Sequence, residues 1–191
     1  RVDGRGRHRG GAARFGARLF SGSLFRPDQI RLNRAAAAPL GDRLKLRYRL
    51  VFFRVDSTLA DIQGIDFLAG GNEEVVRLTE AAMNGEIALD EVYGKRLEII
   101  RPGLADIERL AGEYQKRMLP DAERVVARLR DAGAIIHLVT AGIEQAVRPL
   151  AESLGIRDAA LHAVRLNFNA DGNYADYDRR SFLTRSGGKA V

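Results

Sequence analysis

The 191-residue chain has 46% hydrophobic residues, no cysteine and a formal net charge of +6. This composition is typical of a globular protein with a sizeable core, and it excludes disulfides and thiolate metal sites. No apolar run is long enough to cross a membrane, and the three histidines, His8, His137 and His162, lack the spacing of metal ligands.

The positive charge belongs to the first quarter of the chain. Residues 1–50 hold twelve Arg and one Lys against three Asp, a net charge of +10, so the remainder carries −4. Residues 1–43 are rich in Arg, Gly and Ala without a helical or strand period, which predicts a largely unstructured basic extension. An RNA-binding arm or an organelle transit peptide is the alternative for this segment, and the start at Arg1 fits a fragment.

A folded domain is predicted from about residue 44. Residues 50–53, LVFF, form a short apolar run that suits a buried strand, and Asp56, Ser57 and Thr58 follow it. Ligands bind at the carboxyl ends of strands in open α/β sheets. Asp56 therefore marks the expected site, although capping of the next helix is an alternative role for residues 56–58.

Helical periods then recur without an intervening strand. They predict helices over 73–83, ended by Gly85, over 89–100, ended by Pro102, and over 104–118. These helices form an insertion, which we place at residues 64–118 and which the family resemblance described below identifies as a small helical cap. Asp66, within it, is expected to be a surface or capping residue, and Arg96 taken alone is expected to be solvated.

The rest of the chain predicts a compact α/β unit. A helix over 121–131 and a strand over 134–139 lead to Thr140, Ala141 and Gly142, just before a helix over 144–154. A hydroxyl group and free backbone N–H groups at a helix N-terminus favour anion binding. Two short strands, over 164–168 and 174–177, flank residues 169–173 and predict a β-hairpin. We expect an α/β, Rossmann-like core with a mostly parallel sheet, formed by residues 44–63 and 119–191.

The order of these motifs resembles the haloacid dehalogenase-like hydrolase superfamily, and within it the phosphoserine phosphatase branch. The branch's first motif, D-x-D-S-T-L after an apolar strand, corresponds to residues 54–59, RVDSTL. Met83 and Gly85 match its M-x-G pattern, and Arg96 matches the arginine that binds the substrate carboxylate. The T-A-G at 140–142 and the G-G-K ending at Lys189 follow in the same order, so the resemblance covers residues 49–191.

The resemblance implies a role for each matching residue. In these phosphatases the first aspartate attacks phosphorus to form an aspartyl-phosphate, and the second, here Asp56, acts as general acid and base and helps to hold Mg2+. Lys189 would screen charge at the phosphate. The residues implied in phosphate and substrate binding are Thr140, Ala141, Gly142, Arg96, Gln63 and Leu89.

Three features depart from the family pattern. Arg54 occupies the nucleophile's position, where a guanidinium cannot attack phosphorus and places positive charge near the expected metal. Gln63 replaces the glutamate that receives the substrate ammonium group. The fourth motif, a G-D-G-x-x-D-like loop, is not reached before Val191, which fits a fold truncated at its C-terminus.

The expected family activity is Mg2+-dependent hydrolysis of small phosphomonoesters, most simply phosphoserine in serine biosynthesis, with this chain inactive as written. A non-catalytic phosphate-binding relative, with Arg54, Thr140 and Lys189 around the anion, and a phosphatase of another phosphomonoester are the alternatives. The expected partner is a small phosphorylated metabolite. We expect no membrane association, nucleic-acid binding only through the basic extension, and a cytoplasmic location.

Overall fold

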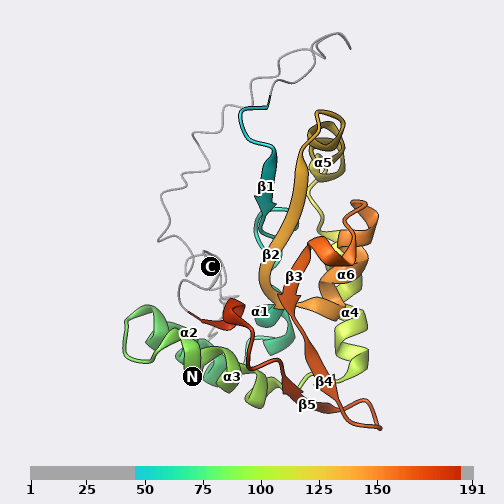
Figure 1. Ribbon diagram of the computed structural model, residues 1–191. Coiled ribbons are helices and arrows are strands. Elements are labelled where there is room, and N and C mark those ends of the chain that lie inside the picture. The colour runs from blue at the N-terminus through green and yellow to red at the C-terminus, as the bar shows by residue number, and fades with distance from the viewer. Residues whose placement is uncertain (1–45, 186–191) are drawn as a thin grey trace, which may run out of the picture. The chain divides into compact units, whose positions relative to one another are not determined.

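A parallel three-stranded sheet organises residues 46–185, the part of the chain that the computed structural model describes (Figure 1). Its strands β1 (Leu50–Phe53), β2 (Ile135–Ile143) and β3 (Leu161–Val164) pair in that order. Parallel strands place their carboxyl ends at one edge, so the segments after β1 and β2 meet there. The predicted α/β fold is confirmed, while the expectations for residues 1–43 and Lys189 lie outside the described residues.

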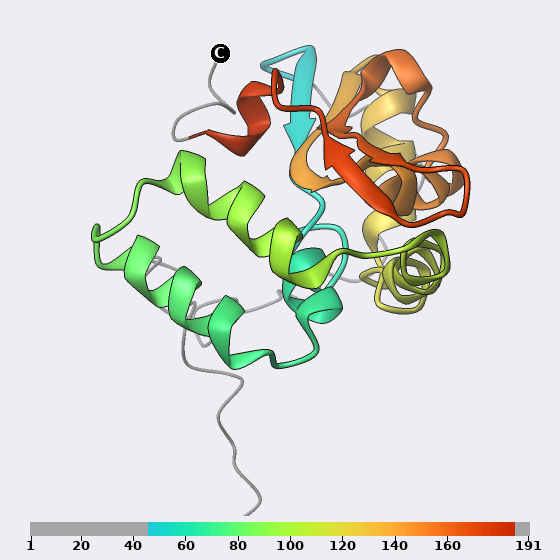
Figure 2. The same cartoon turned by 90° about the horizontal axis from the view of Figure 1, so that it is seen from below.

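Five helices connect β1 to β2 in sequence: α1 (Gly64–Ala69), α2 (Glu73–Met83), α3 (Leu89–Ile100), α4 (Leu104–Lys116) and α5 (Ala122–Asp131). The predicted helices agree with α2 to α5 to within two residues. The six-residue α1 was not predicted, because it is too short to show a helical period. Figure 2 shows α2 and α3 packed side by side away from the sheet. The division into core and cap stays a prediction.

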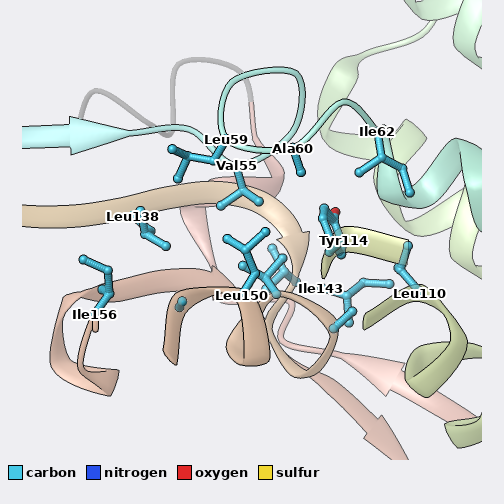
Figure 3. Close-up of a cluster of buried hydrophobic side chains, with 14 of the residues drawn as sticks. Val55, Leu59, Ala60, Ile62, Leu110, Tyr114, Leu138, Ile143, Leu150 and Ile156 are labelled. Atoms are coloured by element: carbon cyan, nitrogen blue, oxygen red, sulfur yellow. The ribbon is translucent and has the colours of Figure 1, made fainter. Parts of the chain in front are cut away.

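The core lies between one face of the sheet and helices α4, α5 and α6 (Glu144–Ser153). Leu138 of β2 is fully buried, and Leu150 of α6 and Val126 of α5 are buried with it. Figure 3 shows Leu138 and Leu150 below the loop that carries Val55 and Leu59. These apolar contacts hold the end of β1 against β2 and α6.

Beyond β3 the chain forms the predicted hairpin, with β4 (Leu166–Phe168) antiparallel to β5 (Tyr174–Tyr177) in a separate two-stranded sheet. The Asn169 side chain accepts hydrogen bonds from the backbone N–H groups of Asp171 and Asn173. Gly172 has a φ of 79°, a left-handed conformation that glycine adopts without steric cost. The single strand predicted over 164–168 divides into the end of β3 and the whole of β4.

The prediction that residues 50–53 form a buried strand is wrong for one face. Leu50 and Phe52 are 49% and 59% exposed, and Ile135 of β2, beside them, is 55% exposed. β1 is at the end of the described strand order, and no described helix covers this face of the sheet (Figure 1). A contiguous apolar run does not distinguish a strand buried on two faces from one buried on a single face.

Replacing Leu138 by Ala should lower the free energy of unfolding by about 2–5 kcal/mol, because it removes fully buried methyl groups and leaves a cavity. Ile135→Ala, on the exposed face of the same strand, should cost less than about 1 kcal/mol. Urea denaturation measures both. Equal losses would contradict the assignment of the two faces.

Candidate active site

Asp56 lies in a tight loop directly after β1. The backbone N–H groups of Thr58, Leu59 and Ala60 all donate to the carbonyl oxygen of Val55, and the Val55 side chain is fully buried. Ser57 has a φ of 56°, which is uncommon for a residue with a side chain. The loop thus turns sharply back under the strand, and it positions the Asp56 carboxylate at the edge of the sheet.

The Asp56 carboxylate accepts hydrogen bonds from three segments of the chain. Its Oδ1 atom accepts from the Tyr114 hydroxyl at 2.7 Å and from the Gly64 backbone N–H at 3.0 Å. Its Oδ2 atom accepts from the Thr140 hydroxyl at 2.8 Å. Asp56 and Thr140, 84 residues apart in sequence, are therefore brought together by the parallel pairing of β1 and β2.

Thr140 and Gly142 form the other half of this site. The Thr140 side chain is buried and accepts a hydrogen bond from the Gly142 backbone N–H at 2.9 Å. A Cβ atom at Gly142 would lie 3.2 Å from oxygen atoms of Asp56, Thr140 and Tyr114, so a bare backbone leaves room for them. The N–H of Gly142 is engaged rather than free, because it donates to the Thr140 hydroxyl. The strand β2 continues to Ile143 instead of ending at residue 139.

Two buried tyrosines join the inserted helices to this edge of the sheet. Burial, and then the negative charge of Asp56, raise the pKa of Tyr114 far above its usual value, so its hydroxyl stays protonated and donates to Asp56. Tyr93 of α3 donates to the carbonyl oxygen of Ala141 at 3.0 Å, and burial raises its pKa as well. Both tyrosines lie within the helices predicted over 89–100 and 104–118, where the helical period indicates apolar faces and no role at the site. The available signal was that a buried tyrosine hydroxyl usually needs a partner.

Arg96 lies on α3 with a side chain that is only 15% exposed, and it forms an ion pair with Asp66 of α1. Its Nε atom is buried without a hydrogen-bond partner among the described residues. Asp66 is therefore not the simple surface or capping residue that we expected. Gln63, at the start of α1, donates from its amide nitrogen to the Ser57 hydroxyl at 2.6 Å.

The chain was compared with known proteins. No family model matches it. It is 34% identical over 143 residues to the chloroplastic phosphoserine phosphatase of Arabidopsis thaliana, which covers 73% of this chain and 48% of that protein. It is 32% identical over 142 residues to the phosphoserine phosphatase of Bos taurus, covering 73% of this chain and 63% of the relative. The chain thus spans about half to just under two thirds of these curated relatives.

Solved structures agree with these relatives. A substrate-bound phosphoserine phosphatase complex aligns with a TM-score of 0.59 and 27% identity, over 75% of this chain and 68% of the other. A phospho-aspartyl intermediate analogue of phosphoserine phosphatase aligns with a TM-score of 0.53 and 30% identity, over 68% and 62%. The chain belongs to the haloacid dehalogenase-like superfamily, in its phosphoserine phosphatase branch.

Arg54, predicted to occupy the position of the branch's first aspartate, follows β1 directly. Its side chain is exposed, and no ion pair or side-chain hydrogen bond connects it with another residue in the range 46–185. Leu89 begins α3, in the helix that also carries Tyr93 and Arg96. Lys189 lies beyond the described residues.

The described residues do not form the Mg2+ site that membership of this branch implies. Between residues 46 and 185, no group of three or more Asp, Glu, His or Cys side chains is arranged to hold a metal ion. Both carboxylate oxygens of Asp56 already accept hydrogen bonds, whereas Mg2+ needs several oxygen ligands. Arg54 would also contribute a positive charge close to Asp56 in sequence.

Replacing Gly64 by Ala should displace the Tyr114 hydroxyl from Asp56, because the new Cβ atom would lie 2.3 Å from that oxygen. We expect a loss of about 1–3 kcal/mol in the free energy of unfolding. The loss should be smaller by about 1 kcal/mol in a Tyr114→Phe background, where the clashing oxygen is gone. A double-mutant cycle in urea measures this coupling.

Gly112→Ala is the matched control, since a Cβ atom at Gly112 of α4 meets nothing within 4 Å. It should leave the protein as stable as before or more stable by up to about 1 kcal/mol, the helix propensity of alanine over glycine. Additive losses for Gly64→Ala and Tyr114→Phe would contradict the contact.

Proposed function

We propose that this chain binds a small phosphomonoester, phosphoserine in the first place, at the edge of the sheet where Asp56 and Thr140 meet. The observation that carries the proposal is the contact between these two side chains next to the bare backbone of Gly142. Both curated relatives are named for phosphoserine, and one of the similar structures contains bound substrate. The expected partner is thus a small phosphorylated metabolite.

The Thr140 hydroxyl and the Gly142 N–H group are the donors that a phosphoryl group would use. At present the hydroxyl donates to Asp56 and accepts from Gly142. A phosphoryl oxygen would replace Asp56 as the acceptor for Thr140, and charge-assisted hydrogen bonds of this kind are the stronger ones. Binding would then require the Thr140 hydroxyl to rotate towards the ligand.

Asp56 would take part in proton transfer to the leaving oxygen of a phosphomonoester in the family reaction. That reaction also needs a nucleophile, which the branch supplies from the position of Arg54. The guanidinium of Arg54 stays protonated in proteins and has no electron pair to form a bond to phosphorus. It can instead donate hydrogen bonds to phosphate oxygens, as arginine commonly does. We infer that the chain binds phosphoserine without hydrolysing it.

Binding of phosphoserine to the chain should persist in EDTA, because the described residues contain no group of three or more Asp, Glu, His or Cys side chains that could hold Mg2+. Arg54→Ala should weaken binding by about tenfold to a hundredfold, as expected for loss of a charge-assisted contact. Titration calorimetry with and without Mg2+ measures both effects. Arg128→Ala, which removes an exposed arginine from α5, is the control and should change the affinity less than twofold. Binding that requires Mg2+ would contradict the proposal.

Incubation of the chain with phosphoserine and Mg2+ should release no inorganic phosphate above the uncatalysed rate, because the family nucleophile is replaced by Arg54. A phosphate-release assay at high protein concentration measures this, with the same assay on a phosphoserine phosphatase as the positive control. Turnover that depends on Mg2+ and disappears in Asp56→Asn would show that the chain is an active phosphatase with another nucleophile.

A further inference from the structure

The face of the sheet opposite the core carries large side chains that no described helix covers. Leu50 and Phe52 of β1 and Ile135 of β2 are about half exposed or more, and His162 of β3 is exposed beside them. Neighbouring exposed apolar side chains of this kind typically mark a binding surface. This face is separate from the edge of the sheet where Asp56 meets Thr140.

Three aromatic rings form a row across this face, one from each strand. Phe52 of β1 pairs with His137 of β2, and their ring centroids are 5.6 Å apart. His162 of β3 pairs with Val139 of β2, one position further along the same face, and its ring centroid is 5.2 Å from that of His137. We call Phe52, His137 and His162 the ring row.

A hydrogen bond fixes the two imidazoles of the ring row relative to each other. Nδ1 of His137 and Nε2 of His162 are 2.9 Å apart, so one nitrogen donates and the other accepts. The two ring planes are within 8° of parallel. The row is therefore a preformed set of π surfaces, and a ligand that stacks on it pays little to order these side chains.

The charge around this face is positive. The strands β1, β2 and β3 contain no Asp or Glu, and exposed Arg47 and Arg49 lie just before β1. Between them, Tyr48 is 68% exposed, and the guanidinium carbon of Arg47 lies 5.5 Å from the centre of its ring. Positive charge and aromatic surface thus occur together beside the first strand of the row, which favours an anionic ligand with flat rings.

A second copy of the chain fits this face less well. Residues 46–54 contain three arginines, Arg47, Arg49 and Arg54, and no acidic residue. Two copies that met along β1 would bring these like charges together, and like charges at close range oppose association. The charge therefore favours a polyanion over self-association.

We propose that this face of the sheet binds single-stranded nucleic acid, with bases stacked on the ring row and the phosphate backbone near Arg47 and Arg49. Exposed rings on neighbouring strands bind two or three bases in known RNA-binding sheets, and basic side chains beside them bind the backbone. A duplex fits less well, because its bases are paired and stacked inside. The inference goes beyond the proposed function and does not rest on it.

Fluorescence anisotropy of the whole chain with a labelled uridine oligomer of about twelve nucleotides tests the proposal, since sites of this kind span about 4–16 nucleotides. The single strand should bind at least about tenfold more tightly than a duplex of the same length, because only unpaired bases stack on exposed rings. Binding through the basic residues 1–43 alone depends on phosphate charge, so it gives no such preference for a single strand.

Phe52→Leu should weaken binding of the oligomer about tenfold, because it keeps an apolar side chain but removes a ring on which a base stacks. Phe52→Tyr keeps the ring and should bind as the wild type does. Val125→Ala is the matched control, since Val125 is an exposed apolar residue of α5, away from the ring row, and it should leave the affinity unchanged. Unchanged urea midpoints show that the variants are folded.

Several results would overturn the inference. Phe52→Leu that binds as tightly as the wild type would show that charge alone holds the oligomer, and so would a duplex that binds equally well. Competition by polyglutamate as effective as competition by unlabelled oligomer would indicate an acidic protein partner instead. A stable dimer in sedimentation that Phe52→Leu dissociates would show that a second copy occupies this face.

Discussion

The half-buried carboxylate of Asp56 is the point on which the arrangement of the candidate site depends. Its three hydrogen bonds come from Gly64 at the start of α1, from Tyr114 on α4 and from Thr140 on β2. A carboxylate removed from water needs such donors, because an unpaired charge in the interior is costly. The same group that would take part in chemistry therefore holds the inserted helices against the edge of the sheet.

This arrangement separates binding from catalysis. Thr140 and Gly142, the donors that the proposed phosphate site would use, are buried at the carboxyl end of β2. We infer that the family nucleophile is replaced by Arg54, whose permanent positive charge cannot attack phosphorus. The Arg96–Asp66 ion pair joins α3 to α1. The proposed function is therefore binding of a phosphomonoester without its hydrolysis.

Within residues 46–185, no helix is long and apolar enough to cross a membrane.

Much of the architecture could be read from local patterns. The 3.6-residue period and the stops at Gly85 and Pro102 located α2, α3 and α4, and residues 169–173 located the hairpin. These features depend on neighbours within a few residues, so the sequence carries them directly. The motif order also identified the family before any comparison. The short helix α1 escaped detection because six residues show no full period.

The sequence by itself determined the element order and the family, and it predicts the substitution of the family nucleophile at Arg54. Only the tertiary structure decided which side chains meet. The hydroxyl of Tyr114 reaches Asp56 from 58 residues away, and Asp66 reaches Arg96 from 30 residues away. The tertiary structure also decided that alternate residues of β1 are exposed, because their exposure depends on which elements pack against each face of the sheet. Local propensity reports the conformation of a segment, whereas contacts between distant segments follow from the packing of the whole domain.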